Sequence, residues 1–285
     1  MVENITDIIF TALKEDIGTG DITTIATIPD NVLGKGIFLI KDDGVIAGLD
    51  VTEQVFKTIN KDLVFLRSMN DGAVVKNGDI VAIVEGSAAS ILTAERTALN
   101  FMQRMSGIAT MASQFREKVK HTKAKIIDTR KTVPGLRFID KLAVRIGGCE
   151  NHRMGLYDMF LIKDNHIAVA GSITNAVKAC RNYRDLKSEN FLIEVETTNL
   201  VEVSEALQSG ANIIMLDNFE LGEMTKAVSL INGNCKVEAS GGVNFNTVKN
   251  IAETGVDFIS VGALTHSVKA LDISLEVQLS RTHAR

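Results

Sequence analysis

One repeated pattern constrains the fold of this chain more than any other feature. Between residues 123 and 263, a short apolar run that ends in a polar residue or glycine, followed by an amphipathic segment, occurs six times. This alternation predicts βα units and a parallel sheet. Because no G-x-G-x-x-G sequence opens a helix, we expect a complete or nearly complete α/β barrel rather than a Rossmann sheet. The residues ending the six runs, which a barrel would bring to one mouth, are Asp128, Lys163, Glu196, Asp217, Ser240 and Gly262.

The amino-terminal part has a different rhythm. Residues 33–87 contain strand-like runs separated by Asp43-Gly44, Asp71-Gly72 and Asn77-Gly78, which predict antiparallel hairpins. Apolar residues at helical spacing predict a helix within 51–59 and a long helix over 90–119. We therefore expect an α/β protein with an amino-terminal mixed α/β domain, residues 1–107, and an α/β-barrel catalytic domain, residues 108–267.

Charge and composition exclude several classes of protein. The chain carries 31 Lys plus Arg against 35 Asp plus Glu, and this net charge of -4 argues against a nucleic-acid or membrane-surface partner. No apolar run approaches the roughly 20 residues of a membrane span, and the first residues lack the basic region of a signal peptide. The 3 cysteines have no paired spacing, which fits a reducing compartment. We expect a cytoplasmic protein.

Positive charge is nevertheless concentrated between residues 123 and 166. Arg130 and Lys131 directly follow the first strand of the repeat, where a guanidinium fork and a neighbouring ammonium suit a small dianion. Arg137, Lys141 and Arg145 lie at four-residue spacing on an expected helix and are better explained as a solvated helix face. The other cations placed at strand ends or in loops are His152, Arg153 and Lys163.

Acidic residues end two consecutive strands of the repeat. Glu194 and Glu196 share a strand face by the period of two, and Asp217 ends the next strand. Three converging acids would repel one another unless a cation lay among them, and carboxylates suit Mg²⁺ that accompanies substrate phosphates. The alternative is that each acid caps a helix or pairs with a lysine.

The last two strands end in glycine-containing loops, Ser240-Gly241-Gly242-Val243 and Val261-Gly262-Ala263-Leu264. Glycines let backbone N–H groups approach an anion, and barrel enzymes bind phosphate after their final strands. These loops, with Ser240 and His266 as further donors, predict a monophosphate site. The alternative is a pair of plain tight turns.

The sequence resembles the quinolinate phosphoribosyltransferases over nearly its whole length. The resemblance begins at ALKEDIGTGDITT and continues in order through ERTALN, SGIAT, DTRKTVPGLR, GGCENHRMGLYD, LIKDNH, EVE, MLDNF, EASGGV and VGALTHS. It implies an amino-terminal mixed α/β sandwich domain, completed by a carboxyl-terminal helix over 268–285 and packed on an incomplete α/β barrel, in a homodimer or a higher homo-oligomer. The implied activity transfers a phosphoribosyl group from phosphoribosyl pyrophosphate to quinolinate, releasing pyrophosphate and CO₂ and giving nicotinate mononucleotide for NAD synthesis.

The resemblance also implies roles for particular residues. Quinolinate would be bound by Arg130, Lys131, His152, Arg153 and Lys163, together with Arg96 from the other subunit. Glu196 and Asp217 would lie around Mg²⁺ and the ribose or pyrophosphate, with Glu194 as a possible substitute for Glu196. The 5′-phosphate would be bound by Ser240, Gly241, Gly262 and His266. The catalytic residues would be Lys131, Lys163, Glu196 and Asp217.

This chemistry agrees with the residues themselves, since a pyridine nitrogen already has a lone pair and needs no general base. Two other functions are compatible with parts of the sequence. A phosphoribosyltransferase of the same fold could act on another aromatic acid, such as nicotinate, without decarboxylation. A carrier or binding module is suggested by DGAVVKNGDIVAIVEG, but the continuation Ser87-Ala88-Ala89-Ser90 supplies no lysine for attachment, and the strand-end motifs would be left unexplained.

Overall fold

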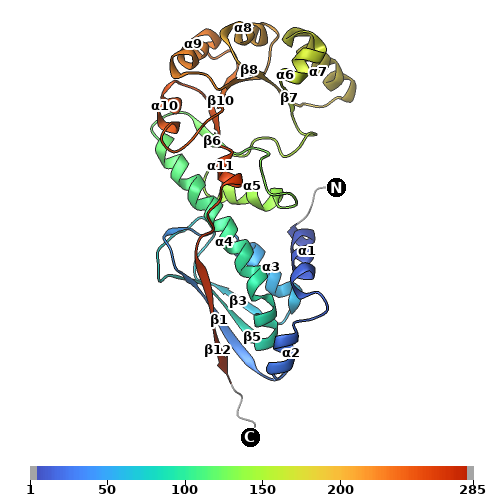
Figure 1. The fold of residues 1–285 in the computed structure, drawn as a ribbon, viewed down its shortest axis with the longest axis vertical. Coiled ribbons are helices and arrows are strands. Elements are labelled where there is room, and N and C mark those ends of the chain that lie inside the picture. Colours follow the sequence, from blue (N-terminus) through green and yellow to red (C-terminus); the bar gives the residue numbers. More distant parts are fainter. Residues whose placement is uncertain (1–4, 281–285) are drawn as a thin grey trace. The chain divides into compact units, whose positions relative to one another are not determined.

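The computed structural model describes residues 5–280 and divides the chain into two compact units (Figure 1). The first unit comprises Met1–Ser113, Thr132–Gly148 and Thr265–Arg285, and the second comprises Gln114–Lys131 and Cys149–Leu264. The segment Thr132–Gly148 therefore groups with the first unit, although it falls within residues 108–267.

The first unit contains an antiparallel four-stranded sheet with the order β12-β1-β5-β3. Its strands are β1 (Leu33–Ile40), β3 (Val64–Arg67), β5 (Ile80–Ser87) and β12 (Ile273–Ser280). A separate pair is formed by β2 (Gly44–Val45) and β4 (Val74–Val75). The helices are α1 (Ile5–Ile17), α2 (Ile22–Thr27), α3 (Leu49–Ile59), α4 (Ala88–Val119), α5 (Arg137–Ile146) and α11 (Ala263–His266), of which α4 and α11 cross a boundary between the units.

Local packing explains why the sheet of the first unit carries a covering helix. Buried Val51, Val55 and Phe56 lie on one face of α3, as their spacing predicts. The ring of Phe56 meets that of Phe38 on β1 edge-on, with centroids 5.9 Å apart.

The long helix α4 continues through Gly107 without a break. A Cβ at that position would lie 2.2 Å from the Lys269 carbonyl oxygen, so the close approach requires glycine.

Two expectations for this unit are wrong. None of the three predicted turns joins two strands that pair directly. The strand β1 pairs with β5 and β12, β2 pairs with β4, and β3 pairs with β5, so no described strand of this unit pairs with the one that follows it in the sequence. The helix expected over 268–285 is a strand from Ile273 to Ser280, and residues 281–285 lie outside the described part of the chain. The segment ISLEVQLS alternates apolar and polar side chains with the period of two that favours a strand, and pairing with β1 satisfies its backbone.

The second unit contains the predicted parallel sheet. Its six strands have the order β6-β11-β10-β9-β8-β7, so that β6 and β7 form the two edges and the barrel is incomplete. The strands are β6 (Lys125–Ile127), β7 (Phe160–Ile162), β8 (Ile193–Thr197), β9 (Ile213–Asp217), β10 (Lys236–Ser240) and β11 (Phe258–Ser260). The helices between them are α6 (Asp164–Ala170), α7 (Ile173–Lys187), α8 (Leu200–Gln208), α9 (Leu221–Ile231) and α10 (Val248–Glu253). The α/β fold with an incomplete barrel is thereby confirmed, and each of the six predicted strand ends lies within two residues of the observed one.

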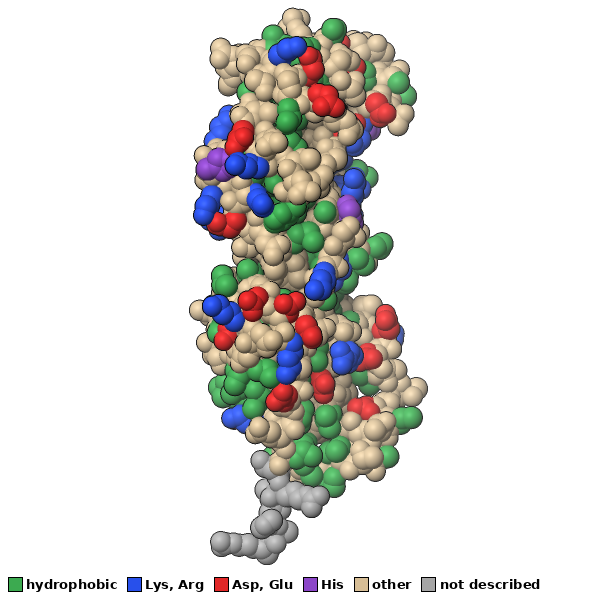
Figure 2. Space-filling model, turned by 60° about the vertical axis from the view of Figure 1, so that its left-hand side comes forward, with side chains coloured by type: hydrophobic (Ala, Val, Ile, Leu, Met, Phe, Trp, Pro, Cys, Tyr) green, Lys and Arg blue, Asp and Glu red, His purple; other side chains and the backbone are tan. Residues whose placement is uncertain are grey.

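The surface and the helices bear on two further expectations. On the face shown in Figure 2, basic and acidic side chains are interspersed, without a broad patch of one sign. No helix within residues 5–280 is both long enough and apolar enough to cross a membrane.

The prediction of a solvated face on α5 is wrong for Lys141, whose side chain is buried, whereas Arg145 is exposed.

Candidate active site

A polar cavity of about 300 Å³ lies in the second unit at the carboxyl ends of the parallel strands. It brings together eight of the residues predicted for the site, namely Arg130, Lys131, His152, Arg153, Lys163, Glu196, Asp217 and Ser240. They come from loops and strand ends that are up to 110 positions apart in the sequence. The barrel topology therefore gathers them as the strand-end pattern predicts.

Backbone pairing places two of the cations at this cavity. The Glu150 N–H donates to the Ile126 carbonyl at 2.9 Å, and the Asp128 N–H donates to the Glu150 carbonyl at 3.2 Å. The segment that follows Glu150 thus runs beside the end of β6 and carries His152 and Arg153 into the cavity wall.

The positive charge of the cavity is incompletely compensated. Among the described residues, Arg130 Nε is buried without a hydrogen-bond partner. Burial and the charge of Arg130 lower the pKa of Arg153, whose Nη1 donates to the Met159 carbonyl at 3.1 Å. Two buried or half-buried guanidinium groups that repel each other favour an anionic ligand, which would satisfy the free donor and offset the repulsion.

His152 is held between two buried acids. Its Nε2 lies 2.9 Å from Glu194 Oε2 and 3.5 Å from Glu238 Oε2, and its side chain is 9% exposed. Burial opposes the charged ring, but the hydrogen bonds and charges of the two carboxylates outweigh it and raise the pKa of His152 to about 9. Burial and the negative charge of Glu238 raise the pKa of Glu194.

The other acids border the cavity itself. Glu196 at the end of β8 forms an ion pair with Lys163, and Asp217 at the end of β9 accepts the Asn218 side-chain amide at 2.8 Å. Both residues line the cavity, whereas Glu194 is fully buried and does not. Of the two glutamates in the EVE triplet, Glu196 is therefore the one placed to meet a ligand.

The predicted phosphate-binding residues are only partly brought together. Ser240 lines the cavity, and Gly241 follows it with a φ of +89° at a point where a Cβ would lie 2.2 Å from Asn218 Oδ1. Only glycine fits this tight loop. Gly262 and His266 are not among the lining residues, and His266 belongs to the first unit. Arg96 lies on α4 in the first unit and is not among them either.

Sequence reasoning missed five residues of the cavity wall: Thr129, Leu161, Met215, Glu238 and Ser260. Glu238 precedes Ser240 by two positions in β10, so the period of two that linked Glu194 to Glu196 also places Glu238 on the face of Ser240. That signal was present in the sequence and would have found it.

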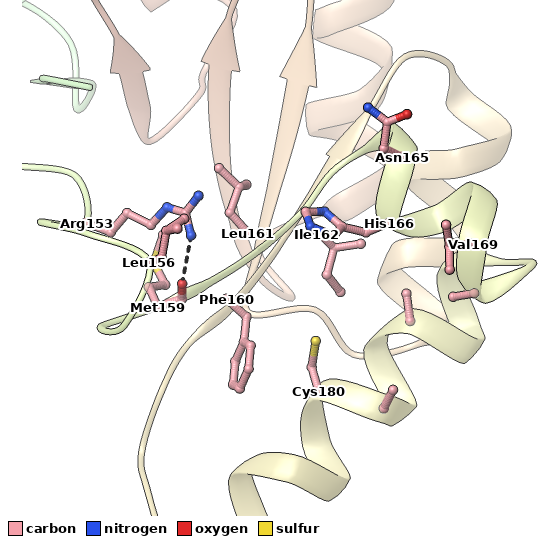
Figure 3. Close-up of a pocket in the computed structure, with 13 residues that line it drawn as sticks. Arg153, Leu156, Met159, Phe160, Leu161, Ile162, Asn165, His166, Val169 and Cys180 are labelled. Atoms are coloured by element: carbon pink, nitrogen blue, oxygen red, sulfur yellow. Dashed lines mark hydrogen bonds between the residues drawn. The ribbon is translucent and has the colours of Figure 1, made fainter. Parts of the chain in front are cut away.

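A second cavity, of about 640 Å³, lies beside β7, α6 and α7 (Figure 3). Arg153 and Leu161 line both cavities. Apart from Arg153 and His166, the wall of the second cavity is formed by apolar, amide or thiol side chains, including Phe160, Val169 and Cys180. It lacks the facing cations and carboxylates, so the smaller polar cavity is the candidate active site.

An incomplete α/β barrel with a cationic wall and two carboxylates at its mouth defines an enzyme that acts on anionic substrates. Residues 21–106 match the sequence profile of "Quinolinate phosphoribosyl transferase, N-terminal domain", and residues 108–276 match that of the corresponding C-terminal domain. The chain belongs to the quinolinate phosphoribosyltransferase family.

Individual relatives agree with this assignment. The chain is 47% identical over 282 residues to the chloroplastic nicotinate-nucleotide pyrophosphorylase (carboxylating) of Oryza sativa subsp. japonica, covering 93% of this chain and 76% of the relative. It is 41% identical to the probable nicotinate-nucleotide pyrophosphorylase (carboxylating) of Bacillus subtilis, covering 93% of this chain and 91% of the relative. The crystal structure of NadC from Streptococcus pyogenes superimposes with a TM-score of 0.93 at 38% identity, covering 97% of each chain.

Proposed function

We propose that the polar cavity of the second unit is the active site for the reaction of this family. The enzyme transfers a phosphoribosyl group from phosphoribosyl pyrophosphate to quinolinate, with loss of pyrophosphate and CO₂, and forms nicotinate mononucleotide for NAD synthesis. The observation that carries the proposal is the arrangement of one wall of cations, on the loop after β6 and the segment after Glu150, opposite two carboxylates at the ends of β8 and β9.

The cationic wall suits a dicarboxylate. The unpartnered Nε of Arg130 and the half-buried guanidinium of Arg153 provide forked donors that match carboxylate geometry. Lys131, His152 and Lys163 border the same space. Several cations exceed what a single carboxylate needs, which favours quinolinate over nicotinate as the substrate.

Glu196 and Asp217 fit a magnesium ion. They are carboxylates at the ends of neighbouring strands that border one cavity, and Mg²⁺ bound through one or two carboxylates completes its shell with water and substrate phosphate. Held by these two carboxylates, Mg²⁺ would supply positive charge that stabilises a pyrophosphate leaving group. Glu196 also forms an ion pair with Lys163, so the lysine and the metal ion would share this carboxylate.

The residues of the chain act mainly by positioning. The pyridine nitrogen attacks with its own lone pair, so the cavity needs no general base for this step, and Arg130 and Arg153 orient the ring. Lys131 and Lys163 stabilise the negative charge that develops on the leaving group. Once the nitrogen is alkylated, it draws electrons from the ring, and the adjacent carboxylate leaves as CO₂.

The remaining assignments complete the proposal. Ser240 and Gly241 bind the 5′-phosphate, and Gly262 extends that site. Arg96 reaches quinolinate from the second subunit of a homodimer. The enzyme works in the cytoplasm, with small-molecule substrates and without nucleic-acid or membrane partners.

The test is an assay of the purified protein with quinolinate, phosphoribosyl pyrophosphate and Mg²⁺, in which CO₂ and nicotinate mononucleotide are both measured. We expect both products in equal amounts, and a large loss of turnover in Arg130→Ala. Replacing quinolinate by nicotinate should abolish product formation. Product from nicotinate alone would assign the substrate to the other aromatic acid, and unchanged kinetics of Arg130→Ala would remove the proposed role of that residue.

A further inference from the structure

The acids that surround His152 have no place in the reaction described above. Glu194 on β8 and Glu238 on β10 have side chains that are 0% and 1% exposed. Their carboxylate oxygens and a ring nitrogen of His152 lie within 4.8 Å of one another. The two strands are separated by β9, and a barrel interior takes the side chains of one layer from alternate strands. The cluster is thus a product of the barrel and involves no loop other than the segment that carries His152.

Both carboxylates are directed at one ring nitrogen. Each has one oxygen within 3.5 Å of His152 Nε2, while the second oxygens, Glu194 Oε1 and Glu238 Oε1, are buried without a hydrogen-bond partner among the described residues. Burying a carboxylate in this way is costly unless it interacts with a positive group. The ring of His152 is the group that both carboxylates share.

The other side of the ring is also fixed. Nδ1 lies 2.8 Å from the backbone nitrogen of Arg153, whose N–H donates to it while that nitrogen is unprotonated. His152 and Glu238 both line the polar cavity, and Glu194 lies behind them. Nδ1 cannot accept this N–H when the ring is charged, so the contacts of Nε2 are the ones that define the orientation of the charged ring beside the cavity.

We propose that Glu194 and Glu238 are positioning residues, which hold the ring of His152 through Nε2 in the orientation in which it meets quinolinate. This inference rests on the proposed function insofar as His152 is part of the quinolinate site. The acids act through His152 and are not ligands of the magnesium ion, which Glu196 and Asp217 bind.

Near-isosteric Glu194→Gln and Glu238→Gln variants test the proposal in the ligand-free protein. The ring resonances of His152 are followed by NMR and assigned by their absence in His152→Asn. We expect them to shift in both glutamine variants. Glu253→Gln is the matched control, because Glu253 forms an exposed pair with another histidine, His121, at 3.1 Å. Unchanged His152 resonances in both glutamine variants would overturn the proposal.

Steady-state kinetics give the second readout. Loss of a charged contact to His152 Nε2, at 2.9 Å from Glu194 or 3.5 Å from Glu238, predicts a rise of about tenfold in KM for quinolinate in each variant, with KM for phosphoribosyl pyrophosphate unchanged. In a His152→Asn background, Glu238→Gln should have no further effect on KM, because the residue through which it acts is gone. An equal rise in both backgrounds would show that Glu238 acts independently of His152.

The same experiments separate this inference from the function on which it rests. An unchanged KM for quinolinate in His152→Asn would refute the place of His152 in the substrate site, whereas the NMR result would still decide what holds its ring. Binding of Mn²⁺ to the ligand-free protein that is lost in Glu238→Gln but retained in Asp217→Asn would make the cluster a metal site and overturn the positioning role.

If neither glutamine variant folds, exchange of the His152 Nε2 proton in the unaltered protein decides the question. It should be slower than that of exposed His121, and an equal rate would contradict the proposal.

Discussion

The carboxylate of Asp128 accepts the backbone N–H of His152 at 2.9 Å. Its other oxygen accepts the side-chain amide of Asn151 at 2.7 Å, and the Asp128 side chain is fully buried. One acid at the end of β6 thus connects the sheet to the segment that carries His152 and Arg153. The position of two cations in the cavity wall depends on it.

Replacing Asp128 with Asn tests this dependence. An amide retains one acceptor oxygen but places an NH₂ group against a second donor, so one of the two hydrogen bonds is lost at a buried site. We expect a loss of about 2 kcal/mol in the free energy of unfolding and a rise of at least tenfold in KM for quinolinate. Urea titration and steady-state kinetics measure the two effects. Asp185→Asn, at a 73% exposed side chain, should change neither, and an unaltered KM in Asp128→Asn would contradict the dependence.

The ion pair between Lys163 and Glu196 leads to a prediction about metal binding. Lys163 neutralises a carboxylate that we assign to Mg²⁺, so Lys163→Met should strengthen binding of the ion to the ligand-free enzyme while lowering turnover. Because the lysine side chain is 44% exposed, solvent screens the pair, and the gain in affinity should be no more than about fivefold.

Calorimetric titration with Mg²⁺ measures this gain. Lys226→Met is the control, since Lys226 pairs with Glu223 on an exposed helix face and should leave the affinity unchanged. Weaker binding of Mg²⁺ in Lys163→Met would show that the lysine supports the ion and does not compete with it.

The strand ends of the barrel were predictable because their signal is local. Each apolar run is short, a polar residue or glycine ends it, and parallel topology alone brings Lys163, Glu196 and Asp217 to one mouth. Depth within the barrel has no such signal. Glu194 and Glu196 lie two positions apart and therefore on the same face of β8, yet only the coordinates show that Glu194 is buried against His152 while Glu196 borders the cavity.

The errors in the first unit have a different origin. The pairing of β1 with β12 joins residues separated by more than 200 positions, and no local turn signal encodes it. The alternation of Ile273, Leu275, Val277 and Leu279 did favour a strand, but the expected helix came from the family resemblance and not from these residues. The burial of Lys141 on α5 was likewise hidden, because spacing alone does not show which helix face the unit covers.

The first unit contains a buried ion pair whose removal should be strongly destabilising. Arg104 Nε and Nη2 donate to the two oxygens of Asp140, each at 2.8 Å, and the Asp140 side chain is 0% exposed. Arg104→Ala would leave a buried carboxylate without its counter-ion, so we expect a loss of about 3 kcal/mol in the free energy of unfolding. Arg104→Lys, which retains the charge but not the fork, should cost less.

Urea unfolding of both variants provides the measurement. Arg67→Ala is the matched control, because Arg67 also contacts two carboxylate groups, those of Asp50 and Glu53, but at an exposed site where removal should cost less than about 1 kcal/mol. Equal losses in Arg104→Ala and Arg67→Ala would show that burial does not determine the strength of the pair.

The cluster around His152 predicts how stability changes with pH. Folding raises the pKa of His152 from its ordinary value of 6.5 to about 9, so the native state binds more protons than the unfolded state between these values. The stabilisation is fully present below pH 6.5 and is lost as the pH rises through 9, with a slope of at most about 1.4 kcal/mol per pH unit. The raised pKa of Glu194 acts in the same direction at lower pH, because the native state again retains the proton longer. Urea titrations at pH 6.5, 7.5 and 9 should therefore show the free energy of unfolding falling more steeply with pH in the unaltered protein than in His152→Asn. Identical slopes in the two proteins would mean that the two carboxylates do not stabilise the charged ring.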